Sequence, residues 1–151
     1  MPHIKYMKVA ISLAKIAYQN GDVPVGAVIV DPNGIIIGQG YNSKEVNNNP
    51  LEHAEMIAIA NAAKTLGQWR LNDCVLYSTL EPCLMCTGAI LQSRIKKVFF
   101  AVSDPKFGTV VSQNQLLDKN KFNHQASYDE GLLELPVKQI LQRFFQEVRK
   151  N

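Results

Sequence analysis

The amino-acid sequence predicts an α/β fold, a three-layer α/β/α domain built around a mixed sheet. Residues 25–30 and 35–38 are β-branched runs joined by an Asp-Pro-Asn-Gly turn, which is typical of an antiparallel hairpin. An apolar run over residues 75–79, a helical segment over 83–92 and a second apolar run over 98–102 then follow one another. That strand, helix, strand order implies parallel pairing. A sheet with both kinds of pairing is mixed, and helices must cover its faces.

The length and composition are those of a single globular domain spanning residues 1–151. With 46% hydrophobic and 19% charged residues, a chain of 151 residues can bury a sizeable core. No stretch approaches about 18 consecutive apolar residues. The N-terminus also lacks a basic region followed by an apolar run. We therefore expect neither a membrane span nor a secretory signal.

The net charge and the cysteine content bear on the class of partner and on the cellular compartment of the protein. The net charge of +3 is too mild to indicate a nucleic-acid partner by itself. Three cysteines, two of them in one closely spaced pair, fit a reducing compartment better than a disulfide framework. We therefore expect a cytoplasmic protein.

The two ends of the chain are predicted to be amphipathic helices. Apolar residues recur at helical spacing over residues 4–19, and Asn20 with Gly21 supplies a stop signal. The C-terminal segment carries one apolar helical stripe, made of Val137, Ile140, Leu141, Phe144, Phe145 and Val148. On this pattern, Phe144 and Phe145 are expected to pack in the core.

Between the hairpin and the second strand run, the sequence predicts a loop and a helix. Residues 40–50 are polar, with three consecutive asparagines, and form a loop that should border the functional site. Residues 54–66 are rich in alanine and apolar on most faces, as expected of a helix pressed between a sheet and a neighbouring element. Gly67 ends that helix.

Two short stretches carry candidate ligands for a metal ion. One contains His53 and Glu55, and the other, Glu-Pro-Cys-Leu-Met-Cys at 81–86, contains Cys83 and Cys86. One imidazole nitrogen and two sulfurs suit Zn²⁺ and leave a fourth tetrahedral position open for water. Glu55 can take a proton from that water. The sequence therefore predicts a hydrolytic zinc centre with its own base.

The spacing of these residues has a local structural explanation. Proline is favoured at the first helical position, so we expect Pro82 to open a helix carrying Cys83 and Cys86 in its first turn. Partial positive charge at a helix N-terminus favours thiolate over thiol. His53 and Glu55 would point about 200° apart within a continuous helix. They are therefore expected at a helix start, with Glu55 leaning over the metal.

Other interpretations of the cysteine pair remain open. A lone CxxC is also typical of a redox pair or of half a structural zinc site. A structural site normally has four protein ligands, but the sequence holds no second CxxC or HxxxH pair. Cys74 lies in an apolar run and is expected to be a small buried residue. His3 and His124 are the other candidate ligands, and His3 lies near a terminus.

These motifs resemble the zinc-dependent cytidine deaminase superfamily, whose signature is HxE followed by PCxxC. The resemblance is to its bacterial tRNA-specific adenosine deaminase branch and covers nearly the whole chain. It rests on Val-Pro-Val-Gly-Ala-Val at 23–28, His-Ala-Glu at 53–55, Trp-Arg-Leu at 69–71, Thr-Leu-Glu-Pro-Cys at 79–83, Ser-Arg-Ile at 93–95, Asp-Pro-Lys at 104–106 and Phe-Asn-His at 122–124. The resemblance implies a cytidine deaminase-like sheet of five strands, one Zn²⁺ per chain and a homodimer.

The activity implied by the resemblance is hydrolytic deamination of adenosine to inosine at the wobble position (34) of a tRNA anticodon. Zinc lowers the pKa of its bound water, and the resulting hydroxide attacks C6 of adenine. Glu55 takes the water proton, delivers it to N1 and later protonates the departing ammonia. His53, Cys83 and Cys86 stay bound to the metal throughout.

The resemblance also implies contacts to the anticodon stem-loop. Asn42 matches the residue that hydrogen-bonds the flipped nucleoside, and Asp104 the one at the ribose. Neighbouring nucleotides and phosphates are assigned to Lys106, Asn123, His124, Phe145 and Arg149. Turn chemistry is an alternative role for Asn42 and Asp104, and a solvated helix face is one for Arg149. Ser103 stands where a related sequence has arginine, which puts one phosphate contact in doubt.

Two rival functions share the zinc signature. A free nucleobase deaminase acting on guanine or cytosine would use the same HxE and PCxxC motifs. The Asp-Pro-Lys and Phe-Asn-His segments and the C-terminal Phe-Phe favour the tRNA branch instead. A non-catalytic zinc and RNA-binding subunit would have lost its catalytic acid, whereas Glu55 is present.

Overall fold

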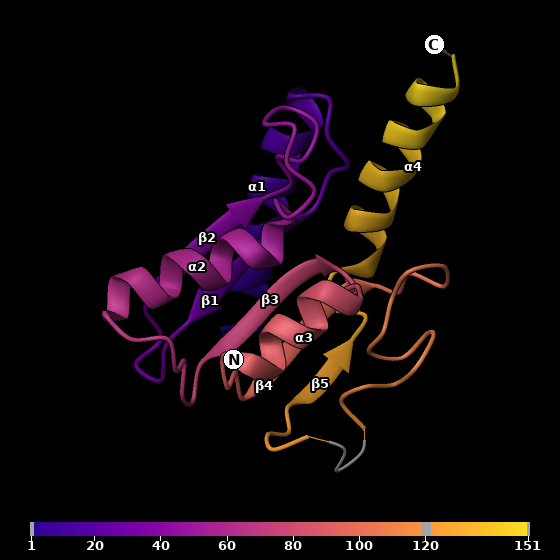
Figure 1. The fold of residues 1–151 in the computed structure, drawn as a ribbon. Helices are drawn as coiled ribbons and strands as arrows, with labels where there is room; N and C mark the ends of the chain where they lie inside the picture. Colours follow the sequence, from indigo (N-terminus) through magenta and orange to yellow (C-terminus); the bar gives the residue numbers. More distant parts are fainter. Residues whose placement is uncertain (1, 119–121, 151) are drawn as a thin grey trace.

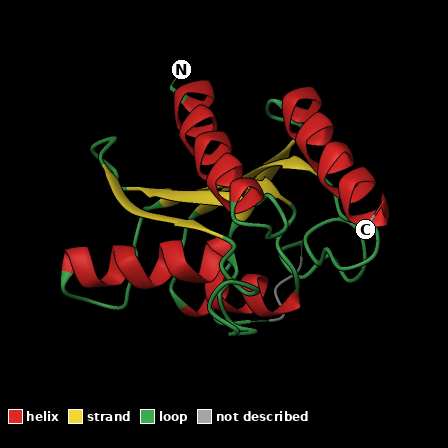
Figure 2. Ribbon diagram, turned by 90° about the horizontal axis from the view of Figure 1, so that it is seen from above, coloured by secondary structure: helices red, strands yellow, loops and turns green. Residues whose placement is uncertain are grey.

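The structure is a computed structural model that describes residues 2–118 and 122–150. A five-stranded sheet lies between two layers of helices (Figure 1; Figure 2). The predicted three-layer α/β/α arrangement is therefore confirmed. In chain order the elements are α1 (His3–Gln19), β1 (Gly26–Val30), β2 (Ile36–Tyr41), α2 (Ala54–Leu66), β3 (Val75–Leu80), α3 (Leu84–Gln92), β4 (Lys97–Val102), β5 (Ser127–Glu130) and α4 (Glu134–Lys150).

The sheet is mixed and has the strand order β2-β1-β3-β4-β5. Strand β1 pairs antiparallel with both β2 and β3, whereas β3, β4 and β5 run parallel. The predicted hairpin and the predicted parallel pair are both confirmed. The fifth strand, Ser127–Glu130, could not be located from its own residues, because four largely exposed residues carry no apolar alternation.

Helices α2 and α3 cover one face of the sheet, and α1 and α4 cover the other (Figure 2). The contact between α2 and β2 is close because the strand presents glycines and the helix presents alanines. A Cβ built on Gly40 would lie 2.4 Å from the carbonyl oxygen of Ala54, and one built on Gly38 would lie 2.2 Å from that of Ala58. The alanine-rich composition of α2 therefore reflects direct packing on the strand backbone.

Aromatic side chains fill the layer on the α1 and α4 side. Tyr77 of β3 and Phe99 of β4 stack with ring centroids 5.0 Å apart beneath α1. In α4, Phe144 is buried and lies edge-on to Tyr18, whereas Phe145 is 44% exposed. The predicted packing of the α4 stripe therefore holds for Phe144 but is wrong for Phe145.

The parallel strands set the position of the functional site. The carboxyl ends of β3, β4 and β5 lie at one edge of the sheet, and α3 begins immediately after β3 at that edge. In open α/β sheets, ligands bind in the crevice outside the carboxyl ends of the strands. Both stretches with candidate metal ligands lie at this edge.

No helix among residues 2–118 and 122–150 has the length and hydrophobicity needed to cross a membrane.

Candidate metal centre

The three candidate ligands are held at the starts of two helices. His53 is the N-cap of α2 and Cys83 is the N-cap of α3, both with extended backbones, and Cys86 lies in the first turn of α3. We expected Pro82 to be the first residue of α3, but the helix begins at Leu84. Cys83 is instead extended because it pairs with Gly108 in an isolated antiparallel bridge. The N-cap conformation directs both side chains over the helix N-termini.

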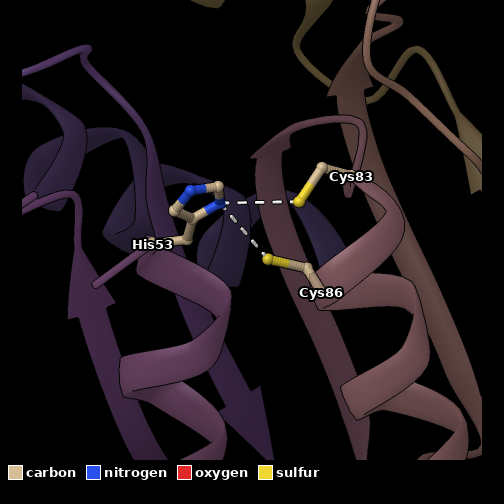
Figure 3. Close-up of side chains that lie close together, drawn as sticks. All are labelled: His53, Cys83 and Cys86. Atoms are coloured by element: carbon tan, nitrogen blue, oxygen red, sulfur yellow. Dashed lines mark hydrogen bonds between the residues drawn. The ribbon is translucent and has the colours of Figure 1, made fainter. Parts of the chain in front are cut away.

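The ligand atoms face one another across the gap between the helices (Figure 3). Nδ1 of His53 lies 3.5 Å from Sγ of Cys83 and 3.6 Å from Sγ of Cys86. Bonds of about 2.3 Å to sulfur and about 2.0 Å to nitrogen in a tetrahedral zinc site separate the nitrogen from each sulfur by about 3.5 Å. The residues therefore fit Zn²⁺. Among the described residues, no fourth His, Cys, Asp or Glu joins the group, so a fourth position stays open.

The two thiols differ in how readily they ionise. Hydrogen bonding to Cys86 and to His53 lowers the pKa of Cys83 to about 4, whereas the bond to Cys83 and burial raise the pKa of Cys86. The pair therefore shares one proton, with the negative charge on Cys83. The hydrogen bond to Cys83 also raises the pKa of His53. A divalent cation at this point favours thiolate at both cysteines.

Glu55 lies beside these ligands in the first turn of α2 and is only 4% exposed. Burial raises the pKa of its carboxyl group to about 7, and the charge of Cys83 acts in the same direction. A group with that pKa can both accept and release a proton near neutral pH, as a general acid and base must. The geometry therefore combines a metal site with a buried proton carrier.

Comparison with known proteins agrees with this chemistry. The family model for the cytidine and deoxycytidylate deaminase zinc-binding region matches residues 1–102. The tRNA-specific adenosine deaminase of Bacillus subtilis (strain 168) is 48% identical over 146 residues, which are 97% of this chain and 90% of that protein. The chain belongs to the tRNA-specific adenosine deaminase family. Zinc is the metal of the deaminase domain, and His53, Cys83 and Cys86 are positioned to bind it.

Solved structures place the chain in the same family. One solved structure comes from a study of A-to-I editing by tRNA:A34 deaminases at the wobble position of transfer RNA. It is 36% identical in sequence and superposes with a TM-score of 0.86, and the match covers 91% of this chain and 99% of that chain. The guanine deaminase of Bacillus subtilis is 34% identical with a TM-score of 0.65, covering 100% of this chain and 96% of that chain. The tRNA-specific adenosine deaminase family thus shares its architecture with free-base deaminases.

Two of the predicted substrate residues lie next to the metal ligands, and both are also held by local hydrogen bonds. The buried Asn42 accepts a hydrogen bond at Oδ1 from the backbone N–H of Ala54, the residue after His53 (2.8 Å). Asp104 accepts hydrogen bonds at Oδ1 from the backbone N–H groups of Lys106 and Phe107, both at 3.2 Å. Asp104 therefore has the turn role that the sequence left open, whereas Asn42 holds the start of α2 and not a turn of its own.

The structure places Asn123 and His124 at the opposite edge of the sheet. Nε2 of His124 donates a hydrogen bond to the carbonyl oxygen of Ile95 (2.7 Å), which lies just before the start of β4. The metal ligands lie beyond the other end of the parallel strands. Asn123 is exposed beside His124. Within one chain, these two residues and the metal ligands are not brought together.

The remaining predicted contacts are exposed. Lys106 is exposed in the turn that follows Asp104, next to the metal centre. Phe145 and Arg149 are exposed on α4, which starts at the edge of the sheet where β5 ends and projects beyond the sheet (Figure 1).

Sequence reasoning missed Glu81, which organises the loop beside the metal centre. This side chain is 2% exposed, and its Oε2 accepts hydrogen bonds from the backbone N–H groups of Val110, Val111 and Ser112 at 2.8–3.0 Å. Its Oε1 accepts from the Asp104 backbone (2.9 Å) and the Ser112 hydroxyl (2.6 Å). Burial opposes ionisation, but these hydrogen bonds outweigh it and lower the pKa of Glu81. A carboxylate directly after an apolar strand was the available signal, since a buried charge needs partners.

A second buried carboxylate holds the loop on the other side of the site. Oδ2 of Asp22 accepts hydrogen bonds from the backbone N–H groups of Glu45 (2.9 Å) and Val46 (3.4 Å). These residues belong to the polar segment between β2 and α2. Both loops that border the metal centre are therefore anchored by a carboxylate from the interior.

Proposed function

We propose that the protein converts adenosine to inosine by hydrolysis at the wobble position (34) of a tRNA anticodon. The observation that carries this proposal is the grouping of one imidazole nitrogen and two thiols with the buried carboxyl group of Glu55. Close relatives named tRNA-specific adenosine deaminase, up to 48% identical over 97% of the chain, support the choice of substrate.

Each residue of the site has a defined part in this reaction. Zn²⁺, when bound by His53, Cys83 and Cys86, supplies Lewis-acid activation of a water molecule. Glu55 accepts the proton that the water loses and delivers it to N1 of the adenine ring. Glu55, again a carboxylate, then takes a second proton from the hydroxyl group now bonded to C6 and passes it to the amino group, which leaves as ammonia. The pKa of about 7 suits both directions of transfer.

Asn42 and Asp104 are proposed to hold the nucleoside that is turned out of the loop. Because Oδ1 of Asn42 accepts from Ala54, the amide orientation is set and its side-chain nitrogen is the group that remains to donate to the substrate. The Oδ1 of Asp104 is used in its turn, which leaves Oδ2 for a ribose hydroxyl. Lys106, Phe145 and Arg149 are proposed to contact neighbouring nucleotides. Asn123 and His124 could join them only from a second chain or at a distant part of the RNA.

The proposed partners follow from the substrate. The anticodon stem-loop is bound by a homodimer with one Zn²⁺ per chain, in the cytoplasm, where tRNA is modified and used. A dimer also provides a second chain through which Asn123 and His124 could approach a bound RNA. Sedimentation of the zinc-loaded protein, which should give the mass of two chains, tests the assembly.

A free-base deaminase is the second candidate, because the Bacillus subtilis guanine deaminase is 34% identical over the whole chain. The identity of 48% to a tRNA-specific adenosine deaminase and the TM-score of 0.86 to the structure from the tRNA:A34 deaminase study are both higher than the values for the guanine deaminase, and they weigh against this candidate. A non-catalytic subunit is disfavoured because Glu55 is present and buried beside the ligands.

The deciding experiment offers zinc-loaded protein a stem-loop with adenosine at the wobble position, and separately free guanine, cytosine and adenine. We expect inosine at that one position. Glu55→Ala should retain zinc and RNA affinity and lose about 10²- to 10⁴-fold in kcat, the usual contribution of general acid and base catalysis. Product from a free base with an inert stem-loop would move the function to nucleobase salvage.

A further inference from the structure

The turn formed by residues 104–108, here the 104–108 turn, lies directly against a metal ligand. Gly108 pairs with Cys83 in an antiparallel bridge, and the next residue, Thr109, donates its backbone N–H to the carbonyl oxygen of Pro82 (3.0 Å). Residues carried by this turn are therefore at the rim of the active site.

This turn is held rigidly from inside the protein. Gly108 donates its backbone N–H to the carbonyl oxygen of Asp104 (2.8 Å), and Glu81 binds the Asp104 backbone on one side and residues 110–112 on the other. Position 108 admits no side chain, because a Cβ there would lie 2.2 Å from Cδ of Glu81. The direction in which the turn presents its side chains is therefore determined by buried contacts.

What the rigid turn presents is an exposed aromatic ring next to a cation. Phe107 is 61% exposed, and Nζ of Lys106 lies 5.6 Å from the centre of its ring. An exposed aromatic face beside a positive charge matches a nucleotide, whose base is planar and whose phosphate is negative. A purely apolar partner would leave Lys106 without a counter-charge.

Extrusion of a base also creates the need for such a surface. Turning adenosine out of the anticodon loop removes the stacking partner of the adjacent bases, at a cost of a few kcal/mol. An aromatic ring at the rim of the pocket can replace part of that lost stacking. A fixed backbone reduces the conformational entropy that is lost when the ring stacks, and the contacts of Glu81 fix the backbone of the turn.

We propose that Phe107 stacks on the base of a nucleotide adjacent to the extruded adenosine, with Lys106 at its phosphate and Glu81 as the positioning residue of the turn. This assignment rests on the proposed function and adds to it a specificity contact at a flanking nucleotide. Phe107 is thereby a binding residue, whereas Glu81 acts only through the turn.

The test is a thermodynamic cycle on binding, made in the Glu55→Ala background so that turnover does not intervene. Dissociation constants are measured for three stem-loops: intact, abasic 5′ of the wobble adenosine and abasic 3′ of it. Phe107→Ala should weaken binding of the intact loop roughly tenfold, as loss of one base-aromatic stack does. It should have little effect on one of the two abasic loops, because that loop lacks the base that the ring contacts.

Two further variants sharpen the result. Phe107→Tyr keeps a ring and should restore binding, whereas Phe107→Leu keeps apolar bulk without a ring and should not. The matched control is Trp69→Ala. Trp69 is another exposed aromatic residue beside a cation, since the guanidinium of Arg70 lies 4.3 Å from the centre of its ring. It follows the end of α2 that is far from the metal ligands. That control should leave binding of all three loops unchanged.

Equal weakening on all three loops, or none, would overturn the proposal. The proposal would also be overturned if Phe107→Ala changed the sedimentation mass while its effect on binding did not depend on the missing base. That result would assign the ring to a protein interface. If the unsubstituted chain forms inosine but Phe107→Ala changes the dissociation constants of all three loops equally, this contact alone is refuted. Failure of that chain to deaminate the stem-loop would instead refute the proposed function.

Discussion

Two buried glutamates lie within two residues of metal ligands, and their pKa values are shifted in opposite directions. Burial raises the pKa of Glu55 to about 7. Burial acts on Glu81 in the same sense, but hydrogen bonds from Ser112, Val111 and Asp104 lower its pKa overall. A carboxyl group poised near neutrality is suited to proton transfer, whereas one held ionised is suited to anchoring backbone. The hydrogen-bond donors around each side chain therefore decide its role.

Glu81→Gln should reduce the free energy of unfolding by about 1–3 kcal/mol at pH 7, since an amide N–H₂ then faces backbone N–H donors. The ionised form stabilises the fold at pH values above the ordinary glutamate pKa of 4.5, because the folded-state pKa is lower. This stabilisation is lost as the pH falls through the folded-state pKa. The difference between the two proteins should therefore shrink below pH 4.5.

Urea unfolding at several pH values, with a chelator present throughout, measures this difference without a contribution from zinc. Glu45→Gln is the control, because Glu45 is exposed and only its backbone N–H makes a buried contact. A difference for Glu81→Gln that stays constant from pH 7 to pH 3 would contradict the assigned charge state.

At the scale of elements, the close packing of α2 on β2 connects the fold to the metal centre. His53 is the N-cap of α2, so the position of this helix sets the position of its imidazole. The helix can approach the strand only because β2 carries glycines at the contact. A change in β2, on the far side of α2 from α3, is therefore expected to reach the zinc site.

Gly40→Ala places a Cβ 2.4 Å from the Ala54 carbonyl oxygen and should push the start of α2 away from the sheet. We expect weaker zinc binding, by about tenfold or more, together with a loss of stability of about 1–3 kcal/mol from overpacking. Competition with a chromogenic chelator measures the affinity.

Gly88→Ala in α3 is the matched control, because its Cβ would meet nothing within 4 Å. Alanine is the better helix former by about 0.5–1 kcal/mol, so this variant should be at least as stable and retain its zinc affinity. Unchanged zinc affinity in Gly40→Ala would show that the helix start does not follow the strand contact.

At the scale of the whole molecule, the metal ligands join the N-termini of two helices, α2 and α3. His53 and the two cysteines come from separate strand-helix units, so a cation bound by all three links the two halves of the domain. A ligand that binds only the folded state stabilises it by an amount set by its concentration relative to Kd. Zinc should therefore contribute to global stability.

Removal of zinc should lower the melting temperature, on the order of 10 °C for a free zinc concentration about 1,000-fold above Kd. Calorimetry with and without a chelator measures the shift. Cys83→Ser with Cys86→Ser should abolish the dependence on zinc, whereas Cys74→Ala, which changes the remaining cysteine, should retain it. An equal chelator effect in the double variant would place the stabilising metal elsewhere.

The sequence by itself determined the metal ligands, the candidate base and most element boundaries. These features are local: ligand types at short spacing, helix stop signals at Asn20 and Gly67, and β-branched runs around a turn. Helix 54–66 was predicted with the bounds observed, because its alanine-rich composition and the glycine that ends it are properties of consecutive residues. The mixed pairing of the sheet also followed from the order of these local elements.

Only the tertiary structure decided which distant segments meet. Glu81 binds Asp104 and Ser112, which lie 23 and 31 positions further along the chain, and no local pattern encodes these contacts. The structure likewise buries Phe144 and exposes Phe145 from the same apolar stripe, and separates His124 from the metal ligands. Exposure and proximity depend on the packing of whole elements around one sheet, whereas metal chemistry and helix caps depend on neighbours in sequence.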